Sequence, residues 1–155
     1  MSNNVYARLT QLLDQQTVAY EALTHAAVYT SEAAAAVRGT TLSSGAKALV
    51  CKADGDFLMY VLPADRKLAS KQIRKANGIK SLRFASRDEV LEITGLTPGS
   101  IPPFGSLFEL PTYCDVRLES EPTINFNAGD HERSIKIAFV DYVQVEEPIM
   151  GNFAE

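Results

Sequence analysis

Residues 95–105 read GLTPGSIPPFG. Three glycines alternate there with three prolines, and no charged residue occurs between Ile93 and Phe108. Proline removes backbone donors and glycine permits unusual dihedral angles, so neither a helix nor a strand is expected. Pro98-Gly99 favours a type II turn, with proline at its second position and glycine at its third. We predict a rigid, apolar loop.

The same loop contains a candidate oxygen-binding site. Gly99, Ser100 and Ile101 keep their N–H groups between Pro98 and Pro102. Consecutive amide donors held by flanking prolines are able to point at a carbonyl or phosphate oxygen. A rigid, partly buried connector is the simpler interpretation, so the rest of the chain has to decide between the two.

Length and composition restrict the classes of protein to consider. The 155 residues are 46% apolar and carry a net charge of −4, which predicts one domain over residues 1–155. No apolar run is long enough to span a bilayer, and the N-terminus lacks the basic and apolar regions of a secretory signal. We therefore expect a cytoplasmic protein with no membrane partner. Cys51 and Cys114 have apolar neighbours in the sequence, which predicts buried, reduced thiols.

The positive charges are concentrated in one segment. No Asp or Glu occurs between Arg66 and Arg87, although eight of the fifteen basic residues do. A local basic face on an acidic chain favours one anionic partner bound at one place, rather than general DNA binding. A solvated helix face is the alternative. The candidate contacts to nucleic-acid phosphates, on one face of a predicted helix, are Lys71, Arg74 and Lys75.

Local patterns predict helices over 4–15, 31–37, 69–76 and 86–94, and strands over 17–23, 46–53, 57–62, 82–85, 113–114, 124–127 and 134–138. Asp54-Gly55 is typical of a hairpin turn, and Ser86 to Glu89 of a helix capping box. Thr30 or Ser31 is suited to cap the second helix. Residues 141–145 form a last element before an acidic tail that we expect to be mobile. The pattern predicts an α+β fold in which helices surround a mixed, largely antiparallel sheet.

Lys47 is the strongest candidate for chemistry outside the loop. The strand period puts it on the same face as Leu49 and Cys51. Burial would lower the pKa of its amine and make it a donor or cation for a developing oxyanion. The simpler alternative is a side chain that extends to solvent from the end of the strand.

The remaining polar residues suggest no acid–base machinery. His25 follows a strand and is suited to line a cleft, whereas His131 lies in a charged turn and is expected in solvent. Two His and two Cys without ligand spacing predict neither a metal nor another cofactor. Cys114 has no flanking motif of a cysteine hydrolase. Ser100, Asn127 and Asp141 are turn or cap residues by default. An enzyme of this sequence would depend on amides, a cation and groups of the substrate.

Five motifs, in this order along the chain, resemble the YbaK/prolyl-tRNA-synthetase-associated domain, a family of aminoacyl-tRNA deacylases. The resemblance covers about residues 5–146 and is greatest to stand-alone members of the YeaK type. It implies a barrel-like sheet surrounded by helices. The motifs are Thr24-His25, Thr30-Ser31-Glu32-Ala33, Gly45-Ala46-Lys47-Ala48-Leu49, the GxxxP segment Gly99 to Pro103, and Phe126-Asn127-Ala128-Gly129.

The resemblance implies trans-editing, in which a small misattached amino acid (serine, threonine or alanine) is hydrolysed from the 3′ end of a tRNA. Members of this family use a lysine and the amides of a GxxxP segment, and the 2′-hydroxyl of the substrate assists them. In this sequence the lysine corresponds to Lys47 and the GxxxP segment to Gly99 to Pro103. The same correspondence implies that Ser100 helps to position the ester carbonyl or the attacking water. The partners implied are aminoacyl-tRNA and an aminoacyl-tRNA synthetase, and His131 receives no role. The candidate substrate-binding residues are His25, Thr30, Ile101, Pro103, Phe104, Asn127, Gly129 and Asp141.

Two alternatives stay open at this point. One is an inactive tRNA- or synthetase-binding module of the same fold, in which Lys47 only attracts phosphate. The other is a hydrolase of a different small ester that uses Cys114 as its nucleophile.

Overall fold

The computed structural model describes residues 4–155, so residues 1–3 of the predicted domain lie outside it. Its strands are β1 (Tyr20–Thr24), β2 (Ala46–Ala53), β3 (Asp56–Pro63), β4 (Leu82–Phe84), β5 (Thr112–Asp115), β6 (Thr123–Asn127), β7 (Arg133–Ala138) and β8 (Ile149–Gly151). Its helices are α1 (Asn4–Gln15), α2 (Ser31–Arg38), α3 (Ser70–Asn77), α4 (Arg87–Thr94) and α5 (Phe139–Glu146), with short 3-10 helices η1 (Gly105–Phe108) and η2 (Val116–Ser120). None of these helices combines the length and apolar character needed to cross a membrane.

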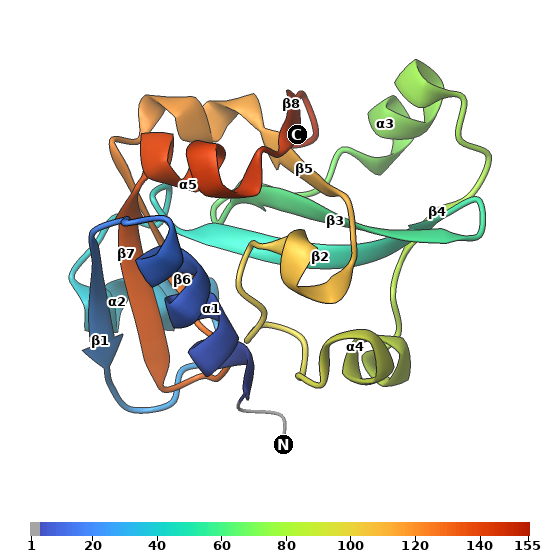
Figure 1. Ribbon diagram of the computed structural model, residues 1–155. Coiled ribbons are helices and arrows are strands. Elements are labelled where there is room, and N and C mark those ends of the chain that lie inside the picture. The colour runs from blue at the N-terminus through green and yellow to red at the C-terminus, as the bar shows by residue number, and fades with distance from the viewer. Residues whose placement is uncertain (1–3) are drawn as a thin grey trace.

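The strands form two sheets. An antiparallel sheet has the order β1-β7-β6, and a five-stranded sheet has the order β4-β2-β3-β5-β8. In the larger sheet β2 is antiparallel to β3 and β4, whereas β5 is parallel to β3 and β8. Figure 1 shows the long β2–β3 hairpin running through the molecule, with α1, α2 and the smaller sheet at one end and α3, α4 and β4 at the other. The predicted α+β class with a mixed sheet surrounded by helices is confirmed, although the sheets do not close into a barrel.

The local signals in the sequence act as expected. Asp54 and Gly55 both have positive φ (47° and 94°), as the two central residues of a type I′ hairpin turn require. Ser86 and Glu89 form the complete capping box of α4. Thr30, not Ser31, caps α2 by accepting the N–H of Ala33. The most displaced boundary is that of β1, which begins at Tyr20 because Thr17 (φ 58°) still belongs to the turn after α1.

The β3 strand is buried on both faces, which explains its continuous apolar sequence. Met59 and Val61 belong to the larger hydrophobic cluster, which also takes in α1, β6 and β7. Leu58, Tyr60 and Leu62 point to the other face and join a smaller cluster beneath α3. The hairpin therefore forms the rigid centre on which the neighbouring segments are placed.

The prediction of a mobile C-terminal tail is wrong. Residues 149–151 form β8, which pairs with β5, and Phe153 is only 8% exposed. The Phe153 ring packs against Tyr60 with 5.3 Å between ring centroids. The buried carboxylate of Asp115 accepts the backbone N–H groups of Phe153 and Ala154, both at 2.8 Å. The acidic composition of the tail concealed these apolar residues, whose partners lie far away in the sequence.

One edge of β2 is left open. Strand β4 pairs with β2 only from Cys51 to Ala53, and at the other end Gly45 forms an isolated bridge to Asn125 of β6. Between these contacts, residues 46–49 have no strand partner on that side within the described part of the chain. Helix α2, the segment before it and the 97–101 loop meet at this gap.

Candidate active site

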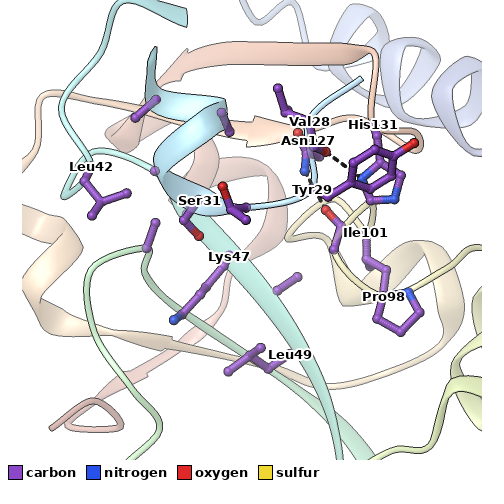
Figure 2. A pocket seen from close by; sticks show the side chains of 18 of the residues that line it. Val28, Tyr29, Ser31, Leu42, Lys47, Leu49, Pro98, Ile101, Asn127 and His131 are labelled. Atoms are coloured by element: carbon purple, nitrogen blue, oxygen red, sulfur yellow. Dashed lines mark hydrogen bonds between the residues drawn. The ribbon is translucent and has the colours of Figure 1, made fainter. Parts of the chain in front are cut away.

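A cavity of about 390 Å³ opens at the free edge of β2. Its walls come from residues 28–31, α2, β2, β4 with Ala85, and the 97–101 loop, with Asn127 and His131 from the β6–β7 turn. Figure 2 shows Lys47 and Leu49 on β2, with Tyr29, His131 and Pro98 grouped on one side of the cavity and Leu42 on the other. Much of the lining is alanine and other apolar residues, so the cavity is largely apolar.

Lys47 is one of two side chains with a fixed positive charge in the lining, the other being Arg38. Burial lowers the pKa of the Lys47 amine, and the nearby carboxylates of Asp65 and Glu32 oppose this effect. Lys47 forms no salt bridge within residues 4–155. Its charge is therefore available to an anionic group of a ligand.

The 97–101 loop has the predicted turn. The Ser100 N–H donates to the Thr97 carbonyl at 3.2 Å, and Gly99 at the third position has φ +92°. The Ser100 hydroxyl also donates to the Thr97 carbonyl, at 2.8 Å, so neither donor of this buried residue is available to a ligand. The amides of Gly99 and Ile101, which both line the cavity, have no acceptor among the described residues. The loop therefore offers two amide donors, not the three expected.

His131 joins two walls of the cavity. Its Nδ1 lies 3.0 Å from the Val28 carbonyl, and its Nε2 lies 3.3 Å from the hydroxyl of Thr97. Because a carbonyl only accepts, Nδ1 carries the proton in the neutral ring and Nε2 accepts from Thr97. The Tyr29 ring, which is 77% exposed, lies 4.6 Å from the imidazole between centroids. Through these two hydrogen bonds, His131 connects the Val28 segment to the 97–101 loop at the mouth of the cavity.

Arg38 enters the cavity from the last turn of α2. Its guanidinium donates to the Ser134 hydroxyl and to Oδ1 of Asn127, each at 2.9 Å. Burial lowers its pKa to about 10, which leaves the group charged at neutral pH. The cavity thus combines two cations and two open amides, and its lining contains no Asp or Glu. Such a set suits the stabilisation of negative charge, not proton abstraction by a carboxylate.

Comparison with known proteins identifies the family. The family described as "Aminoacyl-tRNA editing domain" matches residues 25–145. The chain belongs to the aminoacyl-tRNA editing domain family. It is 37% identical to the "Multifunctional Ser/Thr-tRNA deacylase ProXp-y" of Escherichia coli (strain K12), over 96% of this chain and 92% of that protein. It is 31% identical to a "Proline--tRNA ligase" of Bacillus licheniformis, over 60% of this chain but only 16% of the ligase.

Solved structures agree on the fold. A crystal structure of a candidate trans-editing enzyme for prolyl tRNA synthetase superposes with a TM-score of 0.84, over 97% of both chains, at 21% identity. Together with the family match, this confirms the resemblance drawn from the sequence and, with it, the expected class of enzyme, one that edits aminoacyl-tRNA.

Five of the residues expected at the editing site line the cavity. They come from four separate segments, and only tertiary structure brings them together. Thr30 is at once the cap of α2 and part of the cavity wall. The five are Thr30, Lys47, Gly99, Ile101 and Asn127.

The other expected residues lie outside the cavity lining. Phe104 is fully buried in the core, where it meets Phe126 and Tyr142 edge to face. Pro103 is buried next to it, and its carbonyl accepts the Tyr142 hydroxyl at 2.7 Å. Asp141 lies on α5, a helix that contributes no residue to the cavity lining. These three positions are structural neighbours of the loop and not walls of the cavity.

Ser100, Gly129 and His25 support the cavity from behind. The Gly129 N–H donates to the Ser100 carbonyl at 2.9 Å. A Cβ on Gly129 would lie 3.2 Å from the backbone nitrogen of Tyr6, so a side chain would push α1 away. His25 lies 2.8 Å from the Ser134 hydroxyl, one contact removed from Arg38.

Sequence reasoning missed Arg38 and Tyr29 and gave His131 no role. Arg38 looked like an ordinary basic residue in the last turn of a helix, where cations are common. The sequence nevertheless contained one indication that Arg38 is unusual, because no acidic residue occurs between Ala33 and Ala53. The aromatic contact of Tyr29 with His131 joins distant positions and had no local signal.

The structure argues against the cysteine hydrolase. Cys114 is fully buried and lies outside the cavity lining, and burial raises the pKa of its thiol to about 12. Such a thiol carries almost no thiolate at neutral pH. Cys51 is buried in the same way. Among residues 4–155, no three His, Cys, Asp or Glu side chains gather as ligands of a metal ion.

Proposed function

We propose that this protein is an aminoacyl-tRNA deacylase that acts in trans and hydrolyses the ester between tRNA and a misattached serine or threonine. The observation that carries the proposal is that Lys47 and Gly99 line one cavity in a chain of the editing family. The name of the E. coli relative favours serine and threonine over alanine, which the sequence left equally open. That relative is matched along nearly its whole length, which supports action in trans.

The catalytic groups of this proposal are main-chain donors and one cation. The amides of Gly99 and Ile101 bind the oxyanion as the ester carbonyl becomes tetrahedral. The Lys47 ammonium balances the charge of that oxyanion or of the terminal phosphate. The lining contains no carboxylate, and both nitrogens of its one histidine are engaged. This agrees with the family resemblance, which implies that the 2′-hydroxyl of the terminal ribose assists the attacking water.

Selection of the amino acid follows from the lining. Ala34, Ala46 and Ala48 leave room for a small side chain next to β2, whereas Ile101 and Leu49 limit its length. A pocket of this kind excludes large residues by contact but separates near-isosteres poorly. The lining therefore admits serine, threonine and alanine, and only the name of the E. coli relative favours the first two.

The basic segment between Arg66 and Arg87 binds the acceptor stem in this proposal. Both ends of this segment lie near the cavity. At the first end, Lys67 is close enough to Lys47 to influence the pKa of its amine, and near the other end Phe84 is part of the cavity lining. Lys71 and Lys75 are exposed on α3 between these points. Phosphate contacts from this face would give salt-dependent binding without sequence specificity. We expect the protein to act in the cytoplasm as one domain, with a synthetase as an additional partner.

A panel of mischarged tRNAs tests the function. Wild-type protein is incubated with tRNAs that carry serine, threonine, alanine, valine or proline, and the release of amino acid is followed against the uncatalysed rate. Release of serine or threonine, lost in Lys47→Ala with tRNA binding retained, supports the proposal. Binding of tRNA without release from any substrate would instead make the protein an inactive binding module.

A further inference from the structure

A continuous line of hydrogen bonds runs behind the cavity from the 97–101 loop to residue 26. The Asn127 amide donates to the Gly99 carbonyl, and its Oδ1 accepts from the Arg38 guanidinium. The Nε of Arg38 donates to the Ser134 hydroxyl, which lies 2.8 Å from Nε2 of His25. Nδ1 of His25 lies 2.8 Å from the Ala26 carbonyl and completes the line.

Arg38 at the centre of this line and the Ala26 carbonyl at its end determine the direction of each bond. A guanidinium only donates, so the atom of Asn127 that faces it has to be the acceptor Oδ1. The NH2 group of Asn127 is then directed at the Gly99 carbonyl. On the other branch, Ser134 uses its oxygen to accept from Arg38 and gives its proton to His25, whose Nδ1–H is donated to Ala26. Without Arg38, Oδ1 of Asn127 would lose the one donor that it has among the described residues.

The charge of Arg38 has no counter-ion in the structure. No salt bridge to Arg38 occurs within residues 4–155, and the residue is only partly exposed, against the apolar lining of the cavity. A half-buried cation without a carboxylate is costly to fold, so the two hydrogen bonds that Arg38 donates have to offset its desolvation.

We propose that Arg38 is a positioning residue of the editing site, which orients the Asn127 amide so that it holds the Gly99 carbonyl and fixes the peptide planes of the 97–101 loop. This inference rests on the proposed function, because the loop amides matter only if they bind an oxyanion. The Gly99 carbonyl points to Asn127, so the Gly99–Ser100 peptide has one orientation. The neighbouring amides of Gly99 and Ile101 are thereby held in place. Preorganised donors of this kind are effective because they need no rearrangement as charge develops.

Three variants test the proposal with the intact protein and seryl- or threonyl-tRNA. Arg38→Ala is expected to lower kcat about 10²-fold, the order of loss caused by misplaced groups, with little change in KM. Arg38→Lys recovers only part, because one ammonium does not hold Asn127 and Ser134 together. Millimolar guanidinium ion added to Arg38→Ala is expected to restore part of kcat, because the vacated site opens into the cavity.

Asn127→Asp separates positioning from support of the fold. The carboxylate keeps an acceptor for Arg38 and gains an ion pair, and thermal unfolding checks that the variant is folded. It has no N–H for the Gly99 carbonyl, however, and kcat is expected to fall as far as in Arg38→Ala. A kcat close to wild type in Asn127→Asp, or in Arg38→Ala, would overturn the proposal.

Arg117→Ala is the control, since Arg117 is an exposed arginine that also donates to a side chain and a carbonyl, here Asp115 and Ala154, but lies outside the cavity. It is expected to lose stability and to keep kcat. Hydrogen exchange gives a second reading that needs no activity. The amides of Ser100 and Gly129, both bonded within the loop region, should exchange faster in Arg38→Ala than in Arg117→Ala. Equal exchange in the two variants would refute the positioning role even if the wild type proved inactive on every tRNA, an outcome that by itself would refute only the proposed function.

Discussion

A Cβ atom on Gly99 would lie 3.4 Å from Cε1 of His131, so the turn of the GxxxP loop packs next to the His131 ring at the mouth of the cavity. Gly99 also has φ +92°, a conformation that side chains other than glycine rarely adopt. The backbone angle therefore favours glycine at this position, and a side chain there would also contact His131. Of the two glycines in the cavity lining, Gly45 and Gly99, only Gly99 has a positive φ.

Replacement of Gly99 by alanine should damage the site more than the fold. The backbone strain is expected to cost about 1–2 kcal/mol of unfolding free energy. Contact with His131 should additionally shift the loop and lower kcat. Gly39→Ala is the control, because Gly39 has φ +67° but open space around its Cα. Denaturant unfolding should show similar losses for both, and deacylation should be impaired only in Gly99→Ala. Similar kcat values in the two variants would count against the loop as the oxyanion site.

Lys47→Met should lower kcat without lowering stability. Methionine is similar to lysine in shape. The substitution removes a charge that burial disfavours and that forms no salt bridge with a carboxylate among residues 4–155. We expect a loss of about 10²–10³-fold in kcat, comparable to the removal of one oxyanion donor. Single-turnover deacylation measures the loss, and thermal unfolding checks that the melting temperature does not fall. Lys47→Arg, which keeps the charge, should retain more activity than Lys47→Met.

The pH dependence of activity should reveal the environment of Lys47. Burial lowers the pKa of its amine, so the protonated form is lost at a lower pH than for an exposed lysine. Enzyme activity above the spontaneous rate should therefore decline on the alkaline side as pH rises through that pKa. In Lys47→Arg the decline should move to higher pH, because arginine stays protonated. Rates between neutral pH and pH 10, corrected for spontaneous hydrolysis, provide the test. An unchanged alkaline limb in Lys47→Arg would mean that another group causes it.

Charge reversal on α3 should weaken tRNA binding more than chemistry. Lys71→Glu with Arg74→Glu is expected to lower the affinity for full-length tRNA and to reduce its salt dependence by about 1–2 in logarithmic slope. Activity on a short aminoacyl-minihelix should suffer less. Lys136→Glu, on β7 and outside the basic segment, is compared with Lys71→Glu alone, because the two single variants have the same net charge. Unchanged affinity in the double variant would make α3 an ordinary solvated face.

Phe153→Ala should destabilise the protein and leave the site intact. The ring packs against Tyr60 and Tyr113 in the smaller core cluster. We expect a loss of about 3 kcal/mol in the free energy of unfolding, in the range for a buried aromatic ring. Urea titration measures the loss, and kcat under native conditions should match the wild type. A loss near zero in the free energy of unfolding would instead support the mobile tail that the sequence suggested.

The local structure was predictable because its causes are local. Asp54-Gly55 made the hairpin turn, the Ser86 box began α4, and Pro98-Gly99 formed the turn of the loop. Each of these signals acts through hydrogen bonds or dihedral preferences within about four residues. For the same reason the helices and strands were close to their predicted ranges, apart from the start of β1.

The composition of the site was predictable only in part. Lys47 and Gly99 stood out as an unusual residue in an apolar strand and an unusual loop, and both line the cavity. Phe104 was expected in the pocket because it follows the GxxxP segment, but its ring turns into the core against Tyr142. Which way a loop side chain points depends on what packs behind the loop, and this information is absent from the neighbouring sequence.

By itself the sequence determined the turns, caps and apolar strands of this protein, and it contained the motifs of the editing family. Only the tertiary structure decided that Arg38 meets Asn127, that Ser100 turns away from the cavity, and that Phe153 anchors the tail. The physical reason is the range of the interactions. Backbone angles and caps are satisfied within one turn of chain, whereas a buried donor or ring takes whichever distant partner the packed core brings within reach.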